Sequence, residues 1–245
     1  MKLLLLFIST FLISTSLFAK NPIESPTFGD LIKQIIGDEK YVFDDENIQI
    51  KVPNFADNPV QVPIYVNASK IKDAKRMILF ADLNPIPRIV DMQTTKILPV
   101  ISTNIKVAQE TPLRALVLDS KGIWHVGSKN IRSNGGGCDV SSQASTNSDF
   151  AKFLGKTKGK IFEKKDRNRI KASIFHPMET GLIFGNVEFY INTITIKNAN
   201  ELISTIKTSS AISENPRFIF EVKDNSKSYK INFLDNDGND FELEL

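Results

Sequence analysis

The sequence is poor in the residues that most often carry catalysis or cross-links. It has a single cysteine, Cys138, and two histidines, His125 and His176, in 245 residues. One cysteine excludes an intramolecular disulfide and leaves no resolving thiol for a thiol oxidoreductase. The spacing of these three residues matches no standard metal site, so we predict neither a metal nor a cofactor. A formal net charge of +3 gives no argument for nucleic-acid binding.

The N-terminus predicts export. Residues 1–19, MKLLLLFISTFLISTSLFA, place Lys2 before an apolar run and end on the small residue Ala19. This layout is typical of a secretory signal peptide and is too short for a confident membrane span. We therefore predict cleavage after Ala19, export from the cytoplasm and no association with a membrane.

Residues 27–138 predict a first unit made mainly of strands. Residues 27–37, TFGDLIKQIIG, have apolar side chains at helical spacing, which predicts a short helix capped by Thr27. Beyond them the apolar period changes to two, and a continuous apolar run, RMILFADL, is typical of a buried strand. Frequent prolines forbid long helices. Short strands separated by turns predict a β-sandwich that ends near Ile131.

A linker and a second unit follow. Residues 139–165 are polar at first and basic later, which predicts a solvated linker whose last part is compatible with a short helix or an edge strand. Strand patterns resume in residues 166–245, so the second unit is also predicted to be all-β. Near its end Asp237-Gly238 predicts a hairpin turn, which explains the acidic residues 235–240 better than a calcium loop does.

The single cysteine follows three consecutive glycines in the stretch RSNGGGCDVSS. Gly135, Gly136 and Gly137 supply backbone freedom and no side chains, which argues against a packed position for Cys138. A lone thiol in an oxidising compartment can dimerise or oxidise, so we expect a retained thiol to be used. A flexible support does not suit the preorganised site of a cysteine hydrolase. We predict a flexible arm that presents Cys138 to another molecule.

A second stretch, FHPMETGL, interrupts the strand pattern of the second unit. Pro177 and Gly181 are expected to shape a loop at a strand end, and Met178 is expected to pack. We predict a structural or interface role for the motif and assign neither His176 nor Glu179 to catalysis. The residues of the motif are His176, Pro177, Met178, Glu179, Thr180 and Gly181.

These two stretches resemble parts of one family. SxGGGC at the end of a β-sandwich resembles the C-terminal Gly-Gly-Cys arm of SoxY, and residues 175–182 are similar to the His-Pro-Met-Glu-Thr-Gly signature of SoxZ. In the same order, LNPIPRIV and STNIKVAQETPLRALV resemble segments of SoxY, and AISENPRFIFEVK and FLDNDG resemble segments of SoxZ. The resemblance covers nearly all of residues 28–138 and 168–245, and the chain is identified as a SoxY–SoxZ fusion.

The resemblance implies two immunoglobulin-like β-sandwiches packed together in the periplasm, and a carrier that is not an enzyme. In the family the arm cysteine, here Cys138, holds the sulfur substrate covalently. Its partners are a c-type cytochrome complex that conjugates thiosulfate, a di-manganese hydrolase that removes sulfate, and a sulfur dehydrogenase. In free SoxY this cysteine lies at the chain end, whereas here Asp139 follows and the chain runs on, so that the arm is a tethered loop.

Three alternatives stay open. Fused members of the family are also associated with quinoprotein dehydrogenase systems, in which Cys138 would carry another small adduct. A structural pair of β-sandwiches with an incidental thiol belongs to a different class, and the triglycine arm counts against it. A disulfide-linked homodimer through Cys138 is a further hypothesis.

Overall fold

The structure is a computed structural model that describes residues 20–138, 140, 150–199 and 201–245. The predicted signal peptide lies outside the described residues. Within these ranges no helix is long and apolar enough to cross a membrane. In chain order the elements are α1 (Phe28–Ile36), β1 (Tyr41–Phe43), β2 (Gln49–Lys51), β3 (Val62–Asn67), β4 (Arg76–Ala81), β5 (Arg88–Gln93), β6 (Ile97–Ile105), β7 (Thr111–Leu118), β8 (Trp124–Ile131), α2 (Phe150–Phe153), β9 (Thr157–Glu163), β10 (Asn168–Ile174), β11 (Ile191–Asn198), β12 (Glu201–Thr208), β13 (Arg217–Val222), β14 (Lys230–Asp235) and β15 (Asp240–Glu244).

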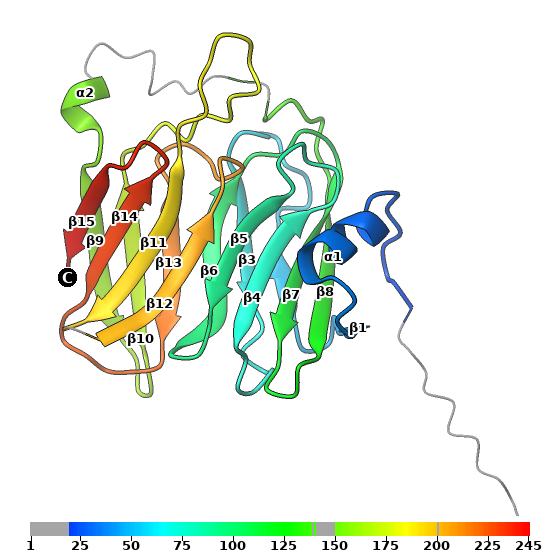
Figure 1. Ribbon diagram of the computed structural model, residues 1–245, viewed down its shortest axis with the longest axis horizontal. Coiled ribbons are helices and arrows are strands. Elements are labelled where there is room, and N and C mark those ends of the chain that lie inside the picture. The colour runs from blue at the N-terminus through cyan, green and yellow to red at the C-terminus, as the bar shows by residue number, and fades with distance from the viewer. Residues whose placement is uncertain (1–19, 139, 141–149, 200) are drawn as a thin grey trace, which may run out of the picture.

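Two sheets packed face to face build the molecule (Figure 1). One has nine strands in the order β1-β8-β7-β4-β5-β12-β11-β14-β15, and the other has six in the order β2-β3-β6-β13-β10-β9. Each sheet takes strands from both predicted units, which meet where β5 pairs with β12 and β6 pairs with β13, both antiparallel. The predicted all-β fold with a short N-terminal helix is confirmed, and the two sandwiches stand side by side with continuous sheets.

The core between the sheets is also continuous. Burial alternates along strands that cover the core with one face, as in β3, whose Val62, Ile64 and Val66 are buried. Ile101 of β6 lies opposite Phe220 of β13 in the strand register, and both side chains belong to one apolar cluster. Because this cluster contains residues of both units, the two units fold around a shared hydrophobic core.

Helix α1 covers the outer face of the nine-stranded sheet. Its buried side chains, Phe28, Ile32 and Ile36, pack with Ile78 and Phe80 of β4 in a second apolar cluster. Strand β4 is therefore buried on both faces, which explains why its sequence is a continuous apolar run and does not alternate. The predicted helix is confirmed, with bounds one residue inside those expected at each end.

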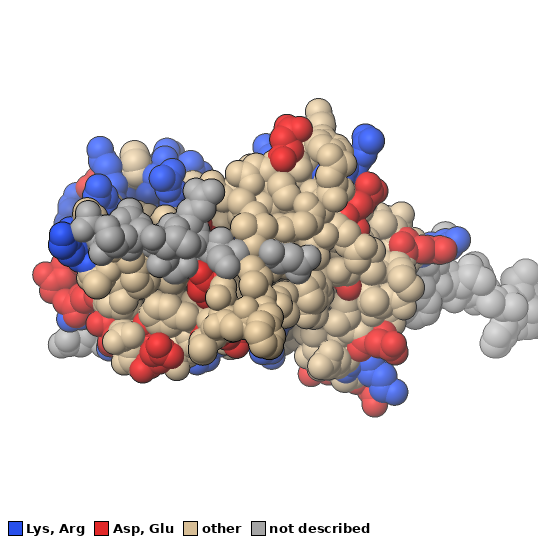
Figure 2. All heavy atoms as spheres, turned by 90° about the horizontal axis from the view of Figure 1, so that it is seen from above, with Lys and Arg blue, Asp and Glu red and all other residues tan. Residues whose placement is uncertain are grey.

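The predicted linker contains regular structure. Its residues 150–153 form α2, and its residues 157–163 form β9, the edge strand of the six-stranded sheet, paired with β10. The second unit thus begins before residue 166, where the sequence pattern placed its start. The sequence pattern left a short helix or an edge strand open for this part of the linker, and the structure contains both. It could not decide between them because Lys158, Gly159 and Lys160 break the apolar alternation, as lysines often do on edge strands. Lys and Arg side chains gather over this edge of the molecule (Figure 2).

The C-terminal hairpin forms as predicted from β14 and β15. The buried carboxylate of Asp235 accepts hydrogen bonds from the backbone N–H groups of Asp237 at 3.0 Å and Asn239 at 2.8 Å. Backbone N–H groups of the turn thus stabilise it through the Asp235 carboxylate, which agrees with the interpretation of this stretch as a hairpin turn.

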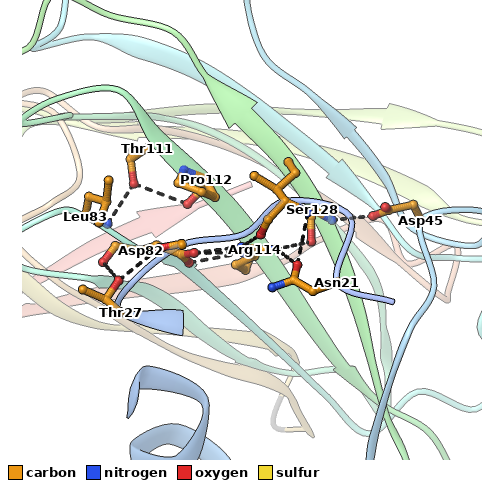
Figure 3. Close-up of polar contacts among 11 residues, drawn as sticks. Asn21, Thr27, Asp45, Asp82, Leu83, Thr111, Pro112, Arg114 and Ser128 are labelled. Carbon is orange, nitrogen blue, oxygen red and sulfur yellow. Dashed lines mark hydrogen bonds and ion pairs between the residues drawn. The ribbon is translucent and has the colours of Figure 1, made fainter. Parts of the chain in front are cut away.

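A buried ion pair fastens the N-terminal segment to the nine-stranded sheet (Figure 3). The guanidinium of Arg114 in β7 lies 2.9 Å from the carboxylate of Asp82, and both side chains are fully buried. The same guanidinium donates to the side chains of Asn21 at 3.0 Å and Ser128 at 2.7 Å. The Thr27 hydroxyl donates to the carbonyl of Asp82 at 2.7 Å, and its side chain makes no helix cap, so the predicted capping is wrong. Burial raises the pKa of the Asp82 carboxyl above its ordinary value, and hydrogen bonds from Arg114 oppose this rise.

We expect Arg114→Met to lower the free energy of unfolding by about 3–5 kcal/mol, because Asp82 would be left as an uncompensated buried charge. Urea denaturation followed by circular dichroism measures the loss. The double variant Arg114→Met/Asp82→Asn removes that charge and is expected to be more stable than Arg114→Met alone. A double variant that is no more stable than the single one would contradict this account.

Candidate functional site

The glycine arm, residues 133–138, lies against the chain that follows β6. The N–H groups of Gly136 and Gly137 donate to the carbonyls of Ala108 and Val107, each at 2.9 Å. The two donors are consecutive residues, and so are the two acceptors. The bonds therefore fix the register of the arm against residues 107–108. The arm that was predicted to be flexible is docked on its own protein in this structure.

Two of the glycines stand where the backbone approaches other backbone closely. A Cβ atom at Gly135 would lie 2.3 Å from the carbonyl oxygen of Ala108, and one at Gly137 would lie 2.0 Å from that of Pro59. Gly135 also has a φ of 82°, in the left-handed region that favours glycine. The motif therefore lets the arm pass through a narrow gap in the protein itself, a reason for the glycines in addition to backbone freedom.

The docked arm carries Cys138 into the interior. Its side chain is 0% exposed. The expectation that three glycines keep this thiol out of a packed position is wrong for this arrangement, because the glycines allow the backbone to fold inward. The hydroxyl of Thr180 donates to the carbonyl oxygen of Cys138 at 3.2 Å. The arm of the first unit thus ends on the HPMETG motif of the second.

The HPMETG motif forms a loop that begins just after β10. The side chain of Met178 is buried in the core, and its N–H donates to Nδ1 of His176 at 3.2 Å. Glu179 and Phe189 exchange two backbone hydrogen bonds, of 2.7 and 3.2 Å, which close the loop. The predicted loop at a strand end and the predicted packing of Met178 are both confirmed. Gly181 follows with a φ of 70°.

A lysine that belongs to neither motif supplies the charge of the site. Lys106 is 5% exposed, and its Nζ donates to the carbonyls of Ser210, at 3.0 Å, and Met178. Burial lowers the pKa of Lys106 to about 8, while the charges of Cys138 and of nearby glutamates act in the opposite direction. The ammonium is therefore still largely protonated at neutral pH. A cation within electrostatic reach of a thiol favours anionic forms of the sulfur.

Comparison with protein families accounts for both units. The family model of the sulfur oxidation protein SoxY matches residues 32–138, and that of the sulphur oxidation protein SoxZ matches residues 158–245. The chain belongs to the SoxY and SoxZ families, joined in one polypeptide. It is thus a SoxYZ fusion and a carrier protein of sulfur oxidation, whose SoxY half ends at Cys138 and whose SoxZ half begins within β9.

Two solved structures are similar to this chain at low sequence identity. Among curated proteins, none matches this chain. The structure of the sulfur carrier protein SoxY from Chlorobium limicola f thiosulfatophilum is similar at 23% identity over 44% of this chain and 96% of that chain, with a TM-score of 0.40. The β-glucuronidase of Parabacteroides merdae is similar at 10% identity over 82% of this chain and 24% of that chain, with a TM-score of 0.25. Both TM-scores are too low to carry a conclusion about this chain.

Sequence reasoning missed Lys106 in the SoxY half. It stands between Ile105 and Val107, so a strict period of two would place its side chain on the outer face. Strand β6 ends at Ile105, however, and the N–H of Lys106 donates to the carbonyl of Ala211 in the SoxZ half at 2.8 Å. Lys106 and Val107 are consequently both buried. The available signal was a single charge inside an apolar strand segment.

His176 in the SoxZ half is buried in its neutral form. Burial lowers its pKa from 6.5 to about 4; the carboxylate of Asp235 opposes this shift, and the Lys106 ammonium adds to it. Among the described residues, Nε2 of His176 has no hydrogen-bond partner, and it lies 3.7 Å from the Asp235 carboxylate. The ring packs on Phe189 with centroids 4.4 Å apart. Such a neutral, packed histidine fits the structural role predicted for the motif.

The second histidine stands in another cluster. His125 in β8 of the SoxY half lies 2.7 Å from the carboxylate of Asp44 and 3.4 Å from that of Asp119. In the part of the chain that the structure describes, no group of three or more His, Cys, Asp or Glu side chains is placed to hold a metal ion. The structure therefore brings Cys138 and the HPMETG motif together and leaves His125 outside the site.

We expect Gly137→Ala to free the arm, because its Cβ would meet the backbone carbonyls of Pro59 and Val107 at 2.0 and 2.7 Å. Cys138 would then react with iodoacetamide at least about tenfold faster than in the native protein, since overpacking of this kind typically costs 1–3 kcal/mol. Gly29→Ala is the control, because no atom lies within 4 Å of its added Cβ. Equal alkylation rates in Gly137→Ala and the unaltered protein would refute the docked arm.

His176 is expected to make the fold sensitive to acid. Below its ordinary pKa of 6.5 the unfolded chain takes up a proton at this histidine, whereas the folded chain does so only near pH 4. Unfolding is therefore favoured as the pH falls through this window, by roughly 3 kcal/mol in total. Urea denaturation at pH 7 and pH 4 measures the effect, and His176→Asn should lose less stability across the window. The same loss in both proteins would contradict the assignment.

Proposed function

We propose that this SoxYZ fusion is a periplasmic carrier that holds a thiosulfate-derived sulfur intermediate covalently on Cys138. One observation carries the proposal: the arm of the SoxY half places Cys138 on the signature loop of the SoxZ half, through the hydrogen bond from Thr180, with Lys106 in electrostatic reach. A thiolate is the nucleophilic form of cysteine, and the proposed cargo is anionic, so a cation suits both.

The proposed loading step is an oxidation. The thiol of Cys138 releases its proton, its sulfur forms a bond to the outer sulfur of thiosulfate, and the two electrons released pass to a c-type cytochrome complex. Hydrolysis by a di-manganese enzyme then adds water across the terminal sulfur–sulfur bond, releases sulfate and leaves a persulfide on Cys138. A sulfur dehydrogenase then oxidises the outer sulfur of the persulfide with oxygen atoms from water and passes six electrons to a cytochrome acceptor. Hydrolysis of the resulting sulfonate releases sulfate and restores the thiol. In this sequence Cys138 is the attachment point and the partners supply the catalysis.

The docked arm must open for these reactions, and its contacts suit that requirement. Three of the bonds that hold it come from the N–H groups of Gly136 and Gly137 and from the hydroxyl of Thr180. A typical hydrogen bond contributes about 1 kcal/mol net, so these three bonds contribute about 3 kcal/mol to the docking of the arm. Binding to a partner commonly supplies more than that. The arm is thus held firmly enough to bury the thiol and weakly enough to be taken up.

A second candidate follows from the chain beyond Cys138. Because the sequence continues into the SoxZ half, a partner must accept a loop, with one chain segment entering and one leaving, where free SoxY offers a single chain end. This difference favours the fused branch associated with quinoprotein dehydrogenases, in which Cys138 would carry another small adduct. The hypothesis of a disulfide-linked homodimer requires the same opening of the arm, because the thiol is buried.

The intact mass of the mature protein, purified without reductant from cells grown with thiosulfate, tests the function. We expect a mass excess that localises to Cys138 and vanishes on reduction, because the cargo is bound through sulfur. Its size identifies the cargo and separates the two candidates. The same measurement locates the N-terminus and so checks cleavage after Ala19.

Cys138→Ser is the matched control and is expected to carry no excess mass. A free thiol in the unaltered protein, unchanged after incubation with thiosulfate and the cytochrome complex, would exclude the thiosulfate carrier. An adduct that persists in Cys138→Ser would exclude Cys138 as the attachment point.

A further inference from the structure

The outer face of the six-stranded sheet carries a groove with a basic rim in the SoxZ half. Lys158 and Lys160 of β9, Lys171 of β10 and Arg217 of β13 line this groove and are all exposed. Its volume is about 420 Å³, and the residues between the cations, among them Ile219, are uncharged. We call this feature the basic groove. Its position agrees with the gathering of Lys and Arg side chains over the β9 edge in Figure 2.

The basic groove brings like charges close together. Lys171 stands directly opposite Lys160 in the register of β10 and β9, an arrangement of like charges that destabilises a sheet. Both ammonium groups lie over the ring of Phe162, at 5.3 Å for Lys160 and 5.0 Å for Lys171. Within the described residues none of the four cations forms an ion pair.

The other end of the same face is built differently. There Arg167 and Arg169 lie 2.7 and 2.5 Å from the buried carboxylate of Glu221. Arg167 and Arg169 are therefore paired with a carboxylate of the same sheet, whereas the cations of the basic groove are exposed to solvent. Among the described residues the fold supplies no carboxylate for this cluster, and an acidic segment of another molecule would offset the repulsion between its cations.

The basic groove lies at the end of the SoxZ half from which the signature loop emerges. Lys158 and Arg217 flank Ser173 on its two neighbouring strands, and the signature loop begins after Ile174. At that end the N–H of Asn215, two residues before Arg217, donates to the carbonyl of His176 at 2.8 Å. The loop that receives Cys138 and the basic groove thus share one end of the SoxZ half.

We propose that the basic groove docks an acidic segment of the partner protein that receives Cys138. Carboxylates of the partner pair with Lys158, Lys160, Lys171 and Arg217, and an apolar side chain between them rests on the uncharged floor. The identity of the partner rests on the proposed carrier function. Complementary charge steers association and can raise the rate of encounter by 10–10³. A groove with charges on its rim fits a protruding acidic loop better than a flat lipid surface.

Binding of the c-type cytochrome complex, measured by surface plasmon resonance at low and high salt, tests the proposal. We expect affinity to fall with salt, and the variant Lys158→Glu/Lys160→Glu/Lys171→Glu to bind at least about tenfold more weakly at low salt. The control Lys33→Glu/Lys72→Glu/Lys121→Glu changes the net charge equally at exposed lysines of the SoxY half and should bind within about twofold of the unaltered protein. Equal losses in the two variants, or binding that is absent or insensitive to salt, would overturn the proposal.

Two further measurements keep the outcomes distinct. The neutral variant Lys158→Gln/Lys171→Gln, whose folding is checked by circular dichroism, should show a smaller loss in the same direction. Intact mass on the same mixtures reports adducts on Cys138: groove-dependent binding without an adduct would refute the carrier function alone, and an adduct with groove-independent binding would refute the docking role alone. Sedimentation with phosphatidylglycerol vesicles that the groove variant abolishes would reassign the groove to lipid and overturn the proposal.

Discussion

Two antiparallel strand pairs, β5 with β12 and β6 with β13, join the halves of this SoxYZ fusion, and the candidate site depends on them. The second pair brings the end of β6 beside residues 210–212, where Ile105 forms a bridge with Ile212. This contact fixes the path of Lys106 and Val107, and Val107 in turn receives the arm. On its other side β13 pairs with β10, and the signature loop that follows β10 reaches Cys138 through the hydroxyl of Thr180. Neither half alone could bury the thiol in this way.

The buried ammonium of Lys106 at the centre of the site carries a desolvation cost that specific contacts offset. Removing an ammonium from water is unfavourable unless hydrogen bonds and opposite charge compensate it. Lys106 is compensated by the carbonyls of Met178 and Ser210, one from the signature loop and one from the segment after β12. Its position therefore depends on both segments of the SoxZ half, although the lysine belongs to the SoxY half. An anionic sulfur group near Cys138 would add to this compensation, which relates the packing of the site to its chemistry.

Much of the fold can be predicted from the sequence, because periods of two and turn residues report directly on strands and hairpins. The hairpin at Asp237-Gly238 and the buried strand β4 are examples. The docked arm could not be predicted, because three glycines are equally compatible with free backbone and with close backbone approach, and only Pro59 and Ala108 decide between them. The continuous sheets escaped prediction as well, because strand patterns report which face is buried and not which edges pair. The family resemblance supplied the role of Cys138, and the structure added its surroundings.

The docked arm also sets a competition. A partner enzyme and the protein's own surface contend for the same short segment, and the internal site is part of the same molecule. A short flexible connection gives an internal ligand an effective concentration in the millimolar range, far above that of a dilute partner. An enzyme with weak affinity for the arm alone therefore leaves the arm docked. An enzyme that also binds another surface of the carrier can displace the arm from its internal site. Burial of the Cys138 thiol therefore restricts its reactions to enzymes that also recognise another surface of the carrier.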